Sequence, residues 1–319
     1  MQRDSWIDYL RVTAVILVVI LHAKARVLSV GANSGIDFYM AITLRNITTF
    51  GVPLFFMMTG YLYLNKQHLY AKDFYVRRLW RVVLPFVVWS YIWLAYQGYD
   101  LTQTAIIMRP ITTPSMYHLW FMYPLICLYL FMPLLFITLR RITPQAVWCI
   151  LAIWLAIGLL IYFPPHDLKS NNLLIWAGYA IAGAAITRKD TLPRWLLAPL
   201  LITITCMVFA SIALYGHKIG AIAYNIRATH TMIACCLVFA LACQMQHRLP
   251  ESKVITYLSQ RSYCVYLIHP FFIELFDQAL FPSNQLPFYY IAVVPSLTLA
   301  SAFAFSGLVK MLRLQRVLG

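Results

Sequence analysis

The sequence contains few charged residues. Asp, Glu, Lys and Arg make up 11% of its 319 residues, against roughly 25% in an average soluble domain. Hydrophobic residues make up 62%, and the mean hydropathy is +0.73. A soluble domain of this length still exposes roughly a quarter of its unfolded surface, so it could not hide so many apolar side chains. The composition excludes a disordered chain, a nucleic-acid-binding domain and a conventional soluble enzyme, and it indicates a protein solvated mainly by lipid.

Several motifs of common enzyme classes are missing. The sequence has no G-x-S-x-G, no P-loop and no H-E-x-x-H, which argues against the usual triad hydrolases, nucleotide-driven pumps and metalloproteases. The seven cysteines form no C-x-x-C pair. We therefore expect no disulfide framework, no zinc site and no other metal ion.

Ten apolar runs are long enough to cross a bilayer as helices, for which about 20 residues are needed. The runs are continuous rather than alternating, which favours helices over barrel strands. The sequence therefore predicts an all-α polytopic membrane protein, with residues 1–319 forming a single transmembrane domain. The ten runs cover residues 9–30, 47–64, 79–97, 118–139, 146–163, 172–187, 194–215, 230–246, 258–280 and 288–311.

The basic residues predict the orientation of these helices. The net charge is +15, and most of the 25 Lys and Arg residues fall in alternate connections. Positive residues stay on the cytoplasmic side of a membrane. We therefore predict that both termini are cytoplasmic and that the number of passes is even.

The first run carries a cation and an imidazole on one stripe. Arg11 and His22 are 11 residues apart, which is close to three full helical turns and about 16 Å along the axis. Asp8 precedes Arg11 by three residues and can pair with it. One interpretation is that Arg11 anchors the helix at the interface while His22 packs in the bundle. The alternative is that His22 is a general base, because a neutral imidazole can accept a proton near neutral pH.

Two arginines begin the third run. Arg78 and Arg81 are spaced i, i+3 at its cytoplasmic end, so a helix places them on one face. They are either positive-inside anchors or a clamp for the phosphates of a nucleotide-type ligand from the cytosol.

Two further histidines lie in polar clusters. His118, in Tyr117-His118-Leu119-Trp120-Phe121, is either an interfacial belt residue or a residue of the outer mouth that contacts an acceptor. In the ninth run, Pro270 follows His269, removes a backbone donor and frees a carbonyl. Because His269 and Glu274 are costly in lipid, we expect them to face the bundle. The sequence leaves two interpretations of this segment open, a structural kink and a functional site.

These clusters together resemble the acyltransferase-3 family of integral membrane O-acyltransferases. The ordered set spans residues 6 to 270, and its strings look most like the branch that O-acetylates bacterial surface glycans, such as enterobacterial common antigen. Thr59 stands where the family usually has Ser. The matching pieces are Trp6-Ile7-Asp8-Tyr9-Leu10-Arg11 with His22, Gly51-Val52-Pro53-Leu54-Phe55-Phe56-Met57-Met58-Thr59-Gly60-Tyr61-Leu62, Arg78-Leu79-Trp80-Arg81, Tyr117-His118-Leu119-Trp120-Phe121 and Tyr266-Leu267-Ile268-His269-Pro270.

The resemblance implies an activity and a set of partners. It implies acetyl-CoA as the cytosolic donor, a sugar hydroxyl of a lipid-linked or surface glycan as the acceptor, and the bacterial inner membrane as the location. It places His22 in the catalytic role beside Arg11, and Arg78 and Arg81 at the donor. The rival hypothesis is a transporter or flippase of a lipid-linked sugar, although paired broken helices and inverted repeats are not found. The oligomeric state stays open, with a homo-oligomer among the alternatives.

Overall fold

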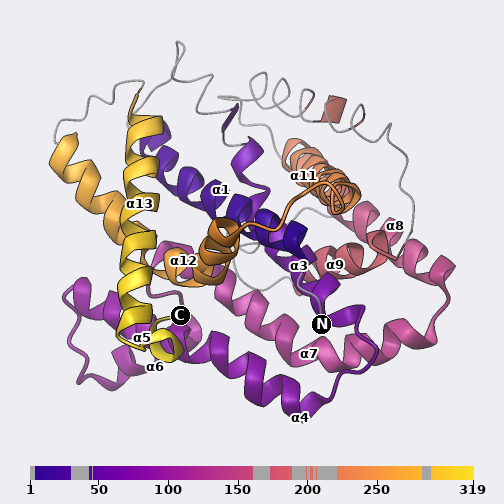
Figure 1. The fold of residues 1–319 in the computed structure, drawn as a ribbon, viewed down its shortest axis with the longest axis horizontal. Helices are drawn as coiled ribbons and strands as arrows, with labels where there is room; N and C mark the ends of the chain where they lie inside the picture. The colour runs from indigo at the N-terminus through magenta and orange to yellow at the C-terminus, as the bar shows by residue number, and fades with distance from the viewer. Residues whose placement is uncertain are drawn as a thin grey trace.

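The computed structural model describes residues 4–29, 43–44, 46–160, 173–188, 199, 202–203, 206, 221–281 and 289–319. Within these ranges the regular structure is helical (Figure 1). The elements are α1 (Ser5–Ser29), α3 (Gly51–Leu64), α4 (Ala71–Phe74), the π-helix η1 (Tyr75–Leu79), α5 (Trp80–Tyr96), α6 (Thr104–Thr112), the 3₁₀-helix η2 (Tyr117–Phe121), α7 (Met122–Arg141), α8 (Pro144–Leu160), α9 (Leu173–Ile186), α11 (Ala221–Gln244), α12 (Lys253–Leu280), α13 (Tyr290–Met311) and α14 (Gln315–Leu318).

In the part of the chain that the structure describes, five helical stretches are long and apolar enough to cross a membrane, which indicates a multi-pass membrane protein. They are Ser5–Ala23, Asn46–Leu64, Ala71–Tyr96, Tyr117–Arg141 and Tyr290–Met311. Each coincides with one of the predicted runs, and an all-helical fold is confirmed for the described residues.

The other predicted runs have different outcomes. Three shorter apolar helices, Pro144–Leu159, Leu173–Ile186 and Thr229–Gln244, coincide with three of them. A fourth run falls within α12, which is more polar because it carries Arg261, His269, Glu274 and Asp277. The run 194–215 lies outside the described residues, apart from 199, 202–203 and 206. The count of ten spans and the cytoplasmic location of both termini therefore stay predictions.

Helix α1 lies in the middle of the bundle (Figure 1) and contacts α3, α11, α12 and α13. Its small and β-branched residues Ala14, Val15, Val18 and Val19 are at most 1% exposed. Because these side chains are short, neighbouring helices approach α1 closely. The polar residues at either end of α1 are thereby brought against α12.

Among the described helices, α3 and α9 form the most extensive pair. A Cβ atom on Gly60 of α3 would overlap the backbone carbonyl of Ala180, and one on Gly183 of α9 would overlap the backbone of Met57. The two backbones touch at these glycines, as in small-residue interfaces between membrane helices. This contact fixes α3, whose Phe55, Met58 and Thr59 line the cavity described below.

Candidate active site

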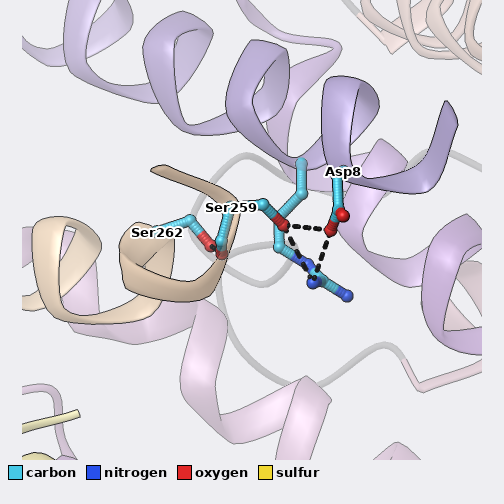
Figure 2. A network of polar contacts seen from close by, with 4 residues as sticks. Asp8, Ser259 and Ser262 are labelled. Carbon is cyan, nitrogen blue, oxygen red and sulfur yellow. Dashed lines mark hydrogen bonds and ion pairs between the residues drawn. The ribbon is translucent and has the colours of Figure 1, made fainter. Parts of the chain in front are cut away.

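A polar network joins the beginning of α1 to α12 (Figure 2). The hydroxyl of Ser259 donates a hydrogen bond of 2.6 Å to Oδ1 of Asp8 and accepts one of 3.1 Å from Nη1 of Arg11. Arg11 also forms an ion pair with Asp8, with Nη1 3.8 Å from Oδ1, which confirms the pairing predicted from their i, i+3 spacing. Asp8 and Ser259 are buried. The network therefore fixes the Arg11 guanidinium against α12.

Arg11 also lines a cavity of about 300 Å³ between α1, α3, η1, α5, η2, α7 and α12. Three arginines, Arg11, Arg78 and Arg81, supply its positive charge. Most of the remaining wall is apolar or aromatic. The other lining residues are Phe55, Met58, Thr59, Leu62, Tyr63, Val82, Phe121, Leu125, Tyr129, Ser259, Gln260, Ser262, Tyr263 and Tyr266. A cavity with guanidinium groups and an apolar wall suits an anionic ligand that carries a long uncharged arm.

Arg78 and Arg81 reach this cavity from a continuous helical stretch with an irregular turn. Residues Tyr75–Leu79 form the π-helix η1, and the α-helix α5 begins directly after it at Trp80. A π-turn widens the helix and often marks a functional site. Both arginines are exposed in addition to lining the cavity, so their end of the cavity lies at the surface of the protein.

Three histidines from three elements lie together at a second place. The ring of His269 in α12 is 5.2 Å from the ring of His22 in α1 and 5.1 Å from the ring of His118 in η2, measured between centroids. His22 also lies 5.0 Å from the ring of Tyr117. His118 and His269 are buried, and His22 is partly buried. We call His22, His118 and His269 the histidine cluster.

The dipeptide His269-Pro270 determines how the ring of His269 is held. Proline has no backbone N–H, so Pro270 leaves the carbonyl of Tyr266, four residues earlier, without its usual helical partner. Nδ1 of His269 lies 2.7 Å from that carbonyl oxygen. The carbonyl that the sequence predicted to be freed is therefore used by the imidazole itself. Glu274, one turn further along α12, is partly buried and accepts a hydrogen bond of 3.1 Å from the hydroxyl of Tyr96.

Tyr266 connects the cavity to the histidine cluster. Its ring lines the cavity, its hydroxyl donates to the backbone carbonyl of His118, and its own carbonyl accepts from His269. The Tyr266 ring lies 5.5 Å from that of His118 and 5.9 Å from that of His269. Tyr266 therefore lies both in the wall of the cavity and against two members of the histidine cluster.

The structure brings the predicted site residues into two groups. Arg11, Arg78 and Arg81 share the cavity, whereas His22 and His118 meet at His269. His118 is only 1% exposed, and its ring lies 5.7 Å from that of Trp93, so it is not an interfacial belt residue. Neither nitrogen of His118 has a hydrogen-bond partner among the described residues.

Sequence reasoning missed Ser259 and the connecting role of Tyr266. Ser259 carries no local signal, because its partners Asp8 and Arg11 are about 250 residues away in the chain. The sequence assigns Tyr266 no role beyond its place in the matching piece Tyr266-Leu267-Ile268-His269-Pro270. The sole available signal was its position four residues before a proline.

Comparison with known proteins identifies the chain only at the level of a family. The model of the acyltransferase-3 family, described as an acyltransferase domain, matches residues 4–306. No curated protein and no solved structure matches. The family match does not support an assignment to the enterobacterial common antigen branch.

Proposed function

The chain belongs to the acyltransferase-3 family, and on this premise we propose that it is a membrane O-acetyltransferase. It moves an acetyl group from cytosolic acetyl-CoA to a sugar hydroxyl of a lipid-linked or surface glycan, in the inner membrane of a bacterium. His22 is the general base, and Arg11, Arg78 and Arg81 bind the donor.

The cavity supports the choice of donor. Coenzyme A carries several phosphate charges on a nucleotide and a long uncharged pantetheine arm. Arg78 and Arg81 lie at the exposed end of the cavity, where forked guanidinium groups suit phosphates. The apolar and aromatic wall beyond them suits the arm. Arg11, held by Asp8 and Ser259, adds a fixed positive charge along the same path.

The histidine cluster supports the choice of base. When the sugar hydroxyl attacks the thioester carbonyl, a C–O bond forms and His22 takes the hydroxyl proton. When the tetrahedral intermediate collapses, the C–S bond breaks, the thiolate of coenzyme A leaves, and it takes up a proton from the imidazolium. General-base help of this kind is worth roughly 10²–10⁴-fold in rate.

One observation carries the proposal. Tyr266 lines the cavity that contains the three arginines, and it bonds two members of the histidine cluster, the backbone of His118 through its hydroxyl and the ring of His269 through its carbonyl. A donor-binding cavity and a group of potential bases are thus adjacent, as acyl transfer requires.

The experiment uses membrane vesicles that contain the full chain and are supplied with acetyl-CoA labelled in the acetyl group. We expect alkali-labile label to accumulate in the glycan fraction. His22→Ala should reduce this incorporation by roughly 10²-fold or more, because the base is lost. Arg81→Ala should instead raise the KM for acetyl-CoA, because a phosphate contact is lost.

His68→Ala is the matched control, since this imidazole is exposed in the connection before α4 and should leave incorporation unchanged. Full activity of His22→Ala would remove His22 from the mechanism. A flippase of lipid-linked sugars would leave acetyl-CoA intact, so the absence of incorporation with the unaltered chain would overturn the proposal as a whole.

A further inference from the structure

We propose that His269 is a positioning residue for His22. During the transfer, a rotation of the two rings lets Nε2 of His269 accept a hydrogen bond from a ring N–H of His22, and this bond directs the other ring nitrogen of His22 at the acceptor hydroxyl. The inference rests on the proposed function, because it assigns a partner to the base of that reaction.

The contact with the carbonyl of Tyr266 defines the tautomer of His269. A backbone carbonyl oxygen can only accept a hydrogen bond, so the 2.7 Å contact between Nδ1 of His269 and the carbonyl of Tyr266 places a proton on Nδ1. In a neutral imidazole the other nitrogen then carries a lone pair. Pro270 maintains this state, because it removes the backbone N–H that would otherwise compete for the carbonyl of Tyr266.

The other ring nitrogen of His269, Nε2, can accept a further hydrogen bond. His269 is fully buried, and its Nε2 has no hydrogen-bond partner among the described residues. Buried polar nitrogens are normally paired, because an unpaired one has lost its hydrogen bonds to water without replacement. Among the described residues, this nitrogen is therefore a buried acceptor that bonds no other group.

The rings of His22 and His269 are separated by the distance that a hydrogen bond between two imidazoles requires. Two imidazole rings joined by a nitrogen-to-nitrogen hydrogen bond of about 2.9 Å have centroids about 5 Å apart. The centroids of His22 and His269 are 5.2 Å apart, with the ring planes inclined by 30°. Among the described residues, the ionisable groups whose rings lie beside this pair are Tyr117 and His118 from η2, and Tyr266 from α12 itself.

The chemical role follows from the proton balance of the transfer. His22 starts with one N–H directed at His269 and one lone pair directed at the sugar hydroxyl. After it takes the hydroxyl proton it is an imidazolium, and the lone pair of His269 stabilises the charge through the retained N–H. The proton gained from the sugar later passes to the departing thiolate, and His269 never exchanges its own Nδ1 proton. This is the arrangement of a base oriented by a third group.

Two substitutions separate this role from a purely structural one. His269→Asn retains a donor near the position of Nδ1, so the contact with Tyr266 survives while the acceptor facing His22 is lost. His269→Gln places an amide near the position of Nε2 and loses the contact with Tyr266. The labelled acetyl-CoA vesicle assay gives kcat and the KM for acetyl-CoA of each variant.

We expect His269→Asn to lower kcat by roughly tenfold or more, as a part of the 10²–10⁴ that general-base catalysis supplies, with the KM for acetyl-CoA unchanged. His269→Gln should retain more of kcat than His269→Asn. If His269 only shapes α12, the order reverses, because Asn preserves the contact with Tyr266 and Gln does not. That reversed order, or full kcat in His269→Asn, would overturn the inference.

His22→Ala in the same assay distinguishes a failure of the positioning role of His269 from a failure of the proposed function. An inactive His22→Ala beside a fully active His269→Asn would reject the positioning role and leave the proposed function standing. An active His22→Ala would reject the base itself. His68→Asn and His68→Gln are the matched controls for the two substitutions.

Discussion

At the scale of single residues, Ser259 determines how Arg11 is held. Its hydroxyl is the only atom of its side chain that can bridge Asp8 and Arg11, and all three contacts lie in one small network (Figure 2). Ser259→Ala should destabilise the protein by about 1–3 kcal/mol, because the buried carboxylate of Asp8 loses a hydrogen-bond donor. It should also raise the KM for acetyl-CoA with little change in kcat.

Thermal unfolding and donor kinetics of the purified chain measure both effects. Ser296→Ala is the control, because the hydroxyl of Ser296 bonds only the carbonyl of Ala292 on an exposed face of α13. Equal behaviour of the two variants would show that the network does not position Arg11 for the donor.

The residues of the candidate site were predictable only as far as local spacing reaches. The i, i+3 spacing predicts that Asp8 lies beside Arg11. The missing backbone N–H of Pro270 predicts a carbonyl without its helical partner, which is that of Tyr266. The approach of His269 to His22 depends on how α12 packs against α1, across about 250 residues of sequence. No periodicity within one helix contains that information.

At the scale of elements, the contact between α3 and α9 depends on two glycines. Gly60→Ala should destabilise the bundle by about 1–3 kcal/mol or more, because its Cβ would overlap the backbone carbonyl of Ala180, which cannot rotate away. Gly307→Ala is the matched control in α13, where the added Cβ meets only the hydroxyl of Tyr257 at 3.0 Å. The fraction of folded protein remaining after a heating series measures both. A Gly60→Ala variant as stable as Gly307→Ala would contradict the close contact.

Element boundaries were predictable only in part. The apolar run 47–64 agrees with the stretch Asn46–Leu64, because the apolar residues and the helix begin and end at almost the same positions. The third run was expected from residue 79, whereas the helical stretch begins at Ala71, since its first turns are polar and exposed. The π-turn at Tyr75–Leu79 and the short helix α6 had no sequence signal.

At the scale of the whole molecule, the charge distribution predicts the topology. With a net charge of +15 and basic residues in alternate connections, the C-terminus should be cytoplasmic and the connection between α5 and α6 should face outward. Alkaline phosphatase, which is active only after export, should therefore be inactive when fused at Gly319 and active when fused after Asp100. An active fusion at Gly319 would contradict the orientation and the even number of passes.

The position of Tyr266 has a consequence for the kinetics of the molecule. Tyr266 lines the cavity, its hydroxyl donates to the backbone carbonyl of His118, and its carbonyl accepts from the imidazole of His269. Under the proposed function, a donor in the cavity touches the residue whose carbonyl orients His269, and any coupling between donor binding and ring alignment is reciprocal. We then expect an ordered sequence of binding, in which the thioester enters before the second substrate and water has little opportunity to react.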